Sequence, residues 1–255
     1  MANEQTETFS EQKLLASVAS GDRIALAKAI TLFEDSVQYP SSLIQIPDSS
    51  SHVIGITGSP GVGKSTTVNA LITHLRSLGK SVAVIAVDPS SPISGGALLG
   101  DRIRLTSHFL DSAVFIRSLA TRGHLGGLSA STGAAIKLAQ LAGFDYVLVE
   151  TVGVGQSEVE VMRHVQTVLI VLAPGMGDDI QASKAGILEI GHVFLINKSD
   201  RDGAKETASQ LEKSLHLSAG NLNWAPVILL GSMEKMTGVE ELLGALDSHY
   251  ESRVQ

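Results

Sequence analysis

The chain has 255 residues, which suits one large domain or one domain with a short extension. Its net charge of −7 provides no broad basic face, which argues against a nucleic-acid partner. It has no cysteine, which excludes a disulfide framework, cysteine-ligated zinc and thiol catalysis. No apolar run reaches the ~18 residues that span a membrane, and the polar start of the chain resembles neither a signal nor a transit peptide. We therefore expect a cytoplasmic protein with no membrane partner.

The N-terminal fifth of the chain predicts a helical extension. After a frayed tail, the pattern from Glu11 to Glu34 indicates two short amphipathic helices broken at Ser20-Gly21-Asp22. Asp22 is placed to cap the second helix. Proline and serine clusters from Gln38 to Ser51 indicate a linker. We therefore assign residues 1–50 to this extension and linker, and residues 51–250 to one P-loop domain.

Apolar strands and helices then alternate to the end of the chain. The predicted strands are Val53–Thr57, Val82–Val87, Ala113–Arg117, Tyr146–Glu150, Thr167–Ala173, His192–Asn197 and Pro226–Leu230. The predicted helices are Ser65–Leu78, Gly100–Leu110, Ser129–Ala142, Ile180–Glu189, Ala204–Leu215 and Gly238–Tyr250. Strands this apolar, separated by helices, predict an α/β fold with a mostly parallel sheet covered on both faces. Ligands of such sheets bind beyond the carboxyl ends of the strands.

A phosphate-binding loop joins the first predicted strand to the helix that follows it. The pattern G-x-x-x-x-G-K-[ST] is fulfilled by Gly58, Ser59, Pro60, Gly61, Val62, Gly63, Lys64 and Ser65, and Thr66 follows. Such a loop points backbone N–H groups at one anion, which the helix dipole also favours. We expect Lys64 to contact the β- and γ-phosphates of a nucleotide and Ser65 to offer its hydroxyl to Mg²⁺.

Carboxylates end two of the predicted strands. Asp88 follows Val82–Val87, and Glu150 ends Tyr146–Glu150. An acid at the end of a strand beside a phosphate loop can hold Mg²⁺ or its waters, or activate a water molecule. Two such acids on core strands favour this role over that of ordinary loop acids. We therefore assign both to catalysis and to the metal site.

A switch is predicted directly after Glu150. Glu150-Thr-Val-Gly153 resembles the Asp-x-x-Gly turn of GTPases, in which the glycine N–H approaches the γ-phosphate. Loss of that phosphate would release the loop. Gln156 stands three residues after Gly153, rather than directly after it as in Ras-like enzymes. We therefore expect slow intrinsic hydrolysis.

A guanine-reading loop is predicted after His192–Asn197. Asn197, Lys198 and Asp200 fit the pattern N-K-x-D, in which the aspartate accepts from N1–H and the exocyclic amine of guanine. Adenine cannot supply both donors in that arrangement, so such a site discriminates strongly. Ser232 and Met233 follow the last predicted strand, where a further base-contacting loop belongs. The expected ligands are GTP and GDP.

These motifs together resemble the MeaB/MMAA family, also named ArgK-type. The resemblance covers about Leu14 to Leu246 and is strongest in a set of short stretches. They are Gly58–Thr66, Val87–Pro92, Gly95-Gly96, Leu99–Arg102, Thr121–Gly127, Glu150–Ser157, Ala173–Asp178, Gln181–Ala185, Asn197–Asp200 and Trp224–Pro226. Members are P-loop GTPases of the SIMIBI type that chaperone adenosylcobalamin-dependent acyl-CoA mutases such as methylmalonyl-CoA mutase.

The resemblance implies further roles and partners. Ser65, Asp88, Asp101 and Glu150 would form the Mg²⁺ shell, directly or through water. Lys184, in a switch over residues 174–185, would move toward the phosphates when a partner docks. The implied partners are a B12-dependent mutase and its adenosyltransferase. Family members usually continue beyond the position of Gln255 into a helical dimerisation arm, so a monomer and a homodimer both remain open.

Two other functions compete with that interpretation. A nickel metallochaperone GTPase shares this fold but needs clustered cysteine and histidine ligands, and the eight histidines here are scattered. An ArgK-type ATPase or kinase linked to amino-acid transport is the other alternative. The N-K-x-D pattern argues against it, because that pattern disfavours adenine.

Overall fold

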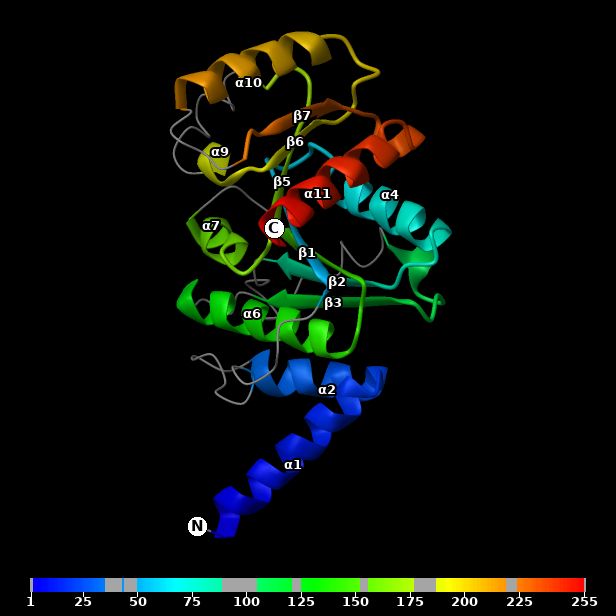
Figure 1. The fold of residues 1–255 in the computed structure, drawn as a ribbon, viewed down its shortest axis with the longest axis vertical. Coiled ribbons are helices and arrows are strands. Elements are labelled where there is room, and N and C mark those ends of the chain that lie inside the picture. The colour runs from blue at the N-terminus through cyan, green and yellow to red at the C-terminus, as the bar shows by residue number, and fades with distance from the viewer. Residues whose placement is uncertain are drawn as a thin grey trace, which may run out of the picture.

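A parallel seven-stranded sheet forms the centre of the molecule (Figure 1). The computed structural model describes residues 2–34, 43, 50–88, 105–120, 125–151, 156–176, 187–218 and 224–254. The strands are β1 His52–Thr57, β2 Val82–Asp88, β3 Val114–Ala120, β4 Tyr146–Thr151, β5 Thr167–Leu172, β6 Val193–Ile196 and β7 Val227–Leu230. Their order is β3-β2-β4-β1-β5-β6-β7, and every pairing is parallel. All seven predicted strands and the parallel α/β fold are confirmed.

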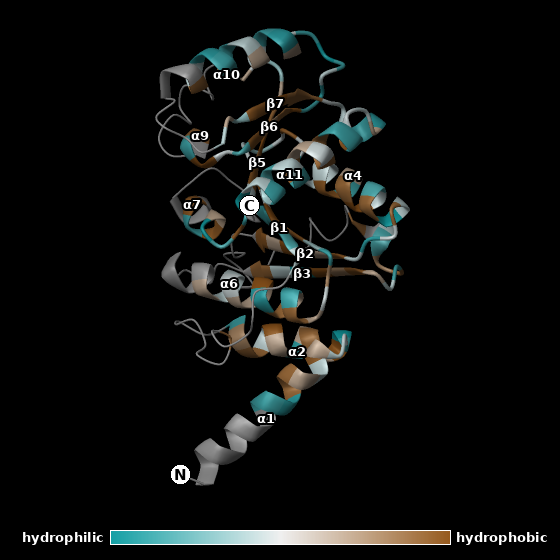
Figure 2. Ribbon diagram, in the orientation of Figure 1, coloured by the Kyte–Doolittle hydropathy of each residue, from teal (hydrophilic) through white to brown (hydrophobic). Residues whose placement is uncertain are grey.

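Helices cover both faces of the sheet. They are α1 Ala2–Ala19, α2 Arg23–Glu34, α4 Lys64–Ser77, α6 Leu125–Leu141, α7 Gln156–Met162, α9 Ile187–Ile190, α10 Ala204–Ser218 and α11 Val239–Val254, with short 3-10 turns η1 Thr106–His108 and η2 Met233–Lys235. The faces separate because successive side chains of a strand point to opposite sides. In β2, Val82 and Val84 pack with α4 and α11, whereas Ala83 and Ile85 pack with α2 and α6. Figure 2 shows the strands as the most hydrophobic part of the chain.

The helix α2 fastens the N-terminal extension to the sheet domain. Asp22 directly precedes it, and its Oδ1 accepts from the backbone N–H groups of Ile24 and Ala25 at 2.8 and 3.1 Å, so the predicted N-cap is confirmed. One face of the helix is apolar and buried, with Leu26, Ala29, Ile30 and Phe33 at helical spacing. Each large one contributes about 1.5–3 kcal/mol by leaving water. In Figure 1, α2 lies between α6 and the projecting helix α1.

Three helix predictions differ from the structure. The N-terminal helix begins at Ala2 rather than near Glu11. The predicted helix over Gly100–Leu110 is wrong in its described part, which is the 3-10 element η1 with flanking turns. There Leu105 is buried, and His108 Nε2 lies 3.0 Å from Asn69 Oδ1 of α4, so packing against α4 replaces helical hydrogen bonding. The helix α7 was not predicted, because its seven residues are too short for a periodic signal.

Two further helix predictions agree with the structure in part. Only the end of Ile180–Glu189 lies among the described residues, and there α9 is helical. The helix α6 begins four residues before the predicted Ser129.

In the described part of the chain, no helix combines the length and hydropathy that a membrane span requires.

Candidate nucleotide site

The glycine loop 58–63 connects β1 to α4 at the carboxyl edge of the sheet. The chain order reverses about β1, because β4, β2 and β3 lie on one side of it and β5, β6 and β7 on the other. Such a reversal opens a crevice beyond the carboxyl ends of the strands. The loop therefore occupies the position where an open parallel sheet binds its ligand.

Two glycines of this loop are required by its geometry. Gly58 has φ 146°, and a Cβ there would lie 2.2 Å from the carbonyl oxygen of Val171. Gly63 has φ 99°, and a Cβ there would lie 2.3 Å from Asn197 Nδ2. Both values are far inside van der Waals contact. The loop can therefore pass beside β5 and the Asn197 side chain only with glycine at both positions.

The Lys64 side chain folds back over the loop. Its ammonium donates to the carbonyl oxygens of Gly58 and Ser59 at 2.7 and 3.1 Å. The residue is 8% exposed, so the charge is held in a place of low solvent access. A phosphate oxygen that enters the loop can replace these carbonyls as the acceptor, and the ammonium then neutralises part of its charge.

The first turn of α4 meets the end of β4 in a side-chain hydrogen bond. The Ser65 hydroxyl donates to Glu150 Oε1 at 2.7 Å, and both residues are buried. The register of the sheet explains the approach, since Glu150 pairs with Ile56, next to the end of β1. A buried hydroxyl and carboxylate this close form the oxygen-rich donor set that Mg²⁺ prefers. These two side chains fit the predicted metal site.

The other predicted ligands and switch residues are described only in part. Asp88 is the last residue of β2, in register with Ala120 of β3, so its backbone reaches the carboxyl edge as predicted. Asp101, Gly153 and Lys184 lie outside the described residues. Their roles stay predictions.

Asn197 joins the phosphate loop to the two loops on the base side. Its Nδ2 donates to the carbonyl of Val62 at 2.9 Å, and its Oδ1 accepts from the N–H of Met233 at 3.0 Å. The side chain is 2% exposed. Lys198, in the left-handed region with φ 57°, donates from Nζ to the carbonyl of Gly61 at 2.6 Å. The predicted phosphate and base motifs therefore form one connected structure.

Asp200 forms an ion pair with the loop after β7. The ammonium of Lys235 lies 2.8 Å from Asp200 Oδ2. The nearby ammonium of Lys235, followed by the Ser232 side chain, lowers the pKa of Asp200 to about 2. The carboxylate is therefore ionised at neutral pH. Lys235 was not predicted; its only sequence signal is its place three residues after Ser232.

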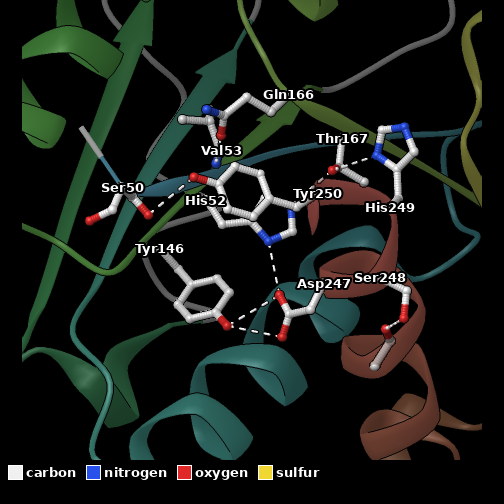
Figure 3. Close-up of polar contacts among 11 residues, drawn as sticks. Ser50, His52, Val53, Tyr146, Gln166, Thr167, Asp247, Ser248, His249 and Tyr250 are labelled. Atoms are coloured by element: carbon white, nitrogen blue, oxygen red, sulfur yellow. Dashed lines mark hydrogen bonds and ion pairs between the residues drawn. The ribbon is translucent and has the colours of Figure 1, made fainter. Parts of the chain in front are cut away.

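A second polar cluster lies at the opposite, amino edge of the sheet (Figure 3). We call it the amino-edge network. His52 Nδ1 lies 2.9 Å from Asp247 Oδ1, and its Nε2 lies 2.8 Å from the Thr167 hydroxyl. That hydroxyl is also 2.9 Å from His249 Nδ1. Tyr146 donates its hydroxyl to the Asp247 carboxylate. The contacts join β1, β4 and β5 to α11.

The protons of this network follow from its acceptors. A carboxylate only accepts, so His52 carries hydrogen on Nδ1 and, when neutral, accepts at Nε2 from Thr167. Thr167 then accepts from His249 Nδ1–H. His192 stacks on His249 with ring centroids 3.9 Å apart, and the N–H of Val168 donates to His192 Nδ1. The contacts of His192 and His249 each have a donor and an acceptor while these two rings are neutral.

The histidine pair disfavours protonation. Burial lowers the pKa of His192 to about 4, and the positive charge of Arg253 adds to the effect. Burial also lowers the pKa of His249 to about 4, with His192, Arg253 and His52 as smaller contributions. No group of three or more histidine, cysteine or acidic side chains in the described part of the chain is arranged to hold a metal. The amino-edge network therefore joins the strands to α11 through side-chain contacts.

Comparison with known proteins identifies the group to which this arrangement belongs. The family model "Methylmalonyl Co-A mutase-associated GTPase MeaB" matches residues 26–254. The chain belongs to the MeaB family of GTPases. A Pyrococcus horikoshii protein named as a GTPase is 46% identical over 245 residues, covering 93% of this chain and 77% of the relative. The Escherichia coli protein "GTPase ArgK" is 38% identical over 257 residues, covering 96% and 76%.

Solved structures place the fold in the same group. The structure titled "LAO/AO transport system kinase" has a TM-score of 0.75 and 29% identity, and the match covers 95% of this chain and 76% of that one. The hydrogenase maturation factor HypB from Archaeoglobus fulgidus matches with a TM-score of 0.55 at 12% identity, which shows the fold alone. The predicted resemblance to the MeaB family and the P-loop fold are both confirmed.

Proposed function

We propose that this protein binds GTP with Mg²⁺, hydrolyses it to GDP and phosphate, and uses the nucleotide state to assist or protect a B12-dependent acyl-CoA mutase. The observation that carries the nucleotide part is the Asn197 side chain, which bonds both Val62 of the phosphate loop and Met233 of the base-side loop. One buried side chain thus fixes the distance between the two ends of a nucleotide site.

On the phosphate side, the backbone and Lys64 would bind the anion. The N–H groups of such a loop and of the first turn of α4 would donate to the phosphates, and the helix dipole would add to their attraction. Lys64 would exchange its two carbonyl acceptors for oxygens of the β- and γ-phosphates. Its burial strengthens this charge-assisted contact relative to one in water.

For the metal, Ser65 and Glu150 would supply oxygen ligands, with Asp88 and Asp101 directly or through water. Mg²⁺ held there would neutralise charge that develops on the β- and γ-phosphate oxygens. Glu150 also orients the Ser65 hydroxyl through their 2.7 Å hydrogen bond. This pairing places both oxygens before any metal arrives.

On the base side, Asp200 would accept from guanine N1–H and the 2-amino group. Asn197 would approach the base edge, and the stem of Lys198 would lie along the base plane, because its ammonium is anchored on Gly61. Ser232 and Met233 would complete the base pocket. A wrong base would leave these polar groups without partners, which costs strongly at a partly buried site.

The partner part of the proposal rests on the family. Its description associates members with methylmalonyl-CoA mutase, and a Caenorhabditis elegans relative named "Methylmalonic aciduria type A homolog, mitochondrial" is 36% identical over 259 residues. We infer that Gly153 senses the γ-phosphate and that Lys184 belongs to the switch that reports it to the mutase. Cofactor loading by the adenosyltransferase would be the step that is gated, in the cytoplasm.

The test is a complex-formation and turnover assay with the B12-dependent mutase of the same organism. We expect binding to the mutase to depend on whether GDP or a non-hydrolysable GTP analogue is present, and the mutase to change the GTPase rate. The absence of a complex in every nucleotide state, with an unchanged rate, would contradict the partner. Equal affinity for ATP and GTP would contradict the guanine assignment and favour an ATPase or kinase.

A further inference from the structure

The loop after β7 is a closed, well-supported turn. Ser232 and Thr237 exchange two backbone hydrogen bonds of 3.0 Å across it, and the N–H of Lys235 donates to the Ser232 carbonyl at 3.0 Å. Met236 turns the chain with φ 56°, and Met233 is 2% exposed, packed in the core below. The backbone that carries Lys235 is therefore fixed in place relative to the sheet.

This turn is also tied to the loop that carries Asp200. The N–H of Ser199 donates to the carbonyl of Gly231 at 3.0 Å, and Asn197 accepts from Met233. From this frame, Lys235 reaches Asp200 Oδ2 at 2.8 Å, with side chains 62% and 37% exposed. An exposed ion pair of this kind adds little to folding stability. The ion pair can instead affect the orientation of the Asp200 carboxylate.

We propose that Lys235 is a positioning residue for base recognition, which holds the Asp200 carboxylate turned toward the guanine edge. The inference rests on the proposed role of Asp200. Guanine presents two neighbouring donors, N1–H and the 2-amino group, and a carboxylate accepts both only when its two oxygens face the base together. The Lys235 ammonium lies 2.8 Å from Asp200 Oδ2 and holds that oxygen in place, while both carboxylate oxygens keep lone pairs for the base.

A lysine in this place also sets the charge that the base meets. Asp200 with Lys235 is close to neutral, so the anionic nucleotide is not repelled by an isolated carboxylate. That contribution affects every nucleotide alike. The orientation of the carboxylate matters most for nucleotides that donate from both N1 and the 2-position, which makes the two contributions separable by experiment.

The experiment compares GDP with inosine diphosphate, which lacks the 2-amino group, on the full-length chain. Lys235→Met removes the ammonium and keeps the stem, Lys235→Arg keeps a cation, and Lys213→Met makes the same charge change on an exposed site of α10. We expect Lys235→Met to weaken GDP about tenfold, as the loss of one hydrogen bond to a charged group does, and to weaken inosine diphosphate less. The preference for GDP should therefore shrink, while Lys235→Arg and Lys213→Met retain it.

Three outcomes would overturn the proposal. Unchanged GDP affinity in Lys235→Met would show an idle surface pair, and tighter binding would show a cation that competes with the base. An equal loss for both nucleotides would show a role in folding the loop or in bulk charge only. Failure of the guanine assignment is separate, because it would appear in the unmodified protein as equal affinity for GDP and ADP.

Discussion

The two edges of the sheet hold polar side chains in different ways. At the carboxyl edge, Lys64, Lys198 and Asn197 bond backbone carbonyls of the phosphate loop, and in the proposed function phosphate oxygens replace those of Lys64. At the amino edge, His52 and Thr167 bond other side chains and join α11 to the strands. The carboxyl edge is the proposed ligand site, whereas the polar groups of the amino edge contact one another. Burial of polar groups therefore does not by itself indicate a binding site.

The largest expected effect comes from the carboxyl edge. Lys64→Ala should weaken GDP and GTP at least about 100-fold, because the buried ammonium contact to the phosphates is lost. Isothermal titration would measure it. Lys80→Ala, a half-exposed lysine before β2 at the amino edge, is the matched control and should bind normally. Equal binding by Lys64→Ala and the unmodified protein would remove the phosphate-loop assignment.

Asn197→Ala should affect both binding and stability. It leaves the Val62 carbonyl and the Met233 N–H without this partner, so we expect GDP to bind about 10-fold to 100-fold more weakly and unfolding to cost about 1–3 kcal/mol less. Nucleotide titration and urea unfolding would measure the two effects. Gln210→Ala, which removes an exposed amide of α10, is the control. If Asn197→Ala lowered the stability but bound GDP with full affinity, the contacts of Asn197 with the phosphate loop and the base-side loop would not be needed for binding.

Thr167→Val tests the amino edge, where we expect an effect on stability without an effect on GDP binding. The substitution keeps the shape but removes the hydroxyl that contacts both His52 and His249, and the residue is fully buried. We expect about 1–3 kcal/mol lower stability and unchanged GDP affinity of the folded protein. The exposed Thr73→Val on α4 should change neither. Weaker GDP binding by Thr167→Val would mean that the two edges are coupled.

The smallest expected effect is a pH dependence of stability from the same edge. The pKa of His192 and that of His249 lie near 4 in the folded protein, below the ordinary histidine value. As the pH falls, both side chains therefore become protonated in the unfolded chain before they do so in the folded protein. Stability should therefore be full above about pH 6.5 and fall as the pH drops toward 4. Urea unfolding from pH 7 to pH 5 would measure the decrease.

His249→Gln sharpens that measurement. The variant should be less stable at pH 7 but lose less stability on acidification, because only one of the two histidines then contributes to the pH dependence. His52, Asp247 and Arg253 also face this pair, so the comparison is made between the variant and the unmodified chain at each pH. An identical pH dependence in both would contradict a role for the histidine pair.

Strands and continuous motifs could be predicted from the sequence, whereas contacts between residues far apart in the chain could not. The strands were predictable because they are apolar throughout, and the loop 58–66 and Asn197–Asp200 because each motif is a short continuous pattern. Lys235 was missed because its approach to Asp200 depends on a turn closed between Ser232 and Thr237. No periodicity predicts such a contact.

The amino-edge network was hidden for the same reason. His52 and Asp247 are separated by 195 positions, and the sequence gives no sign that β1 and α11 meet there. The failed helix at Gly100–Leu110 shows a different limit: in its described part, packing of Leu105 and His108 against α4 outweighs helix propensity.

The central claim is that the carboxyl edge forms one guanine-nucleotide site, read by Asp200. Titration of GDP, ADP and xanthosine diphosphate into the unmodified protein and Asp200→Asn tests it most directly. We predict that the unmodified protein prefers GDP, and that Asp200→Asn loses GDP and gains xanthosine diphosphate, because the amide complements the altered base edge. Unchanged preference for GDP in Asp200→Asn would contradict the account.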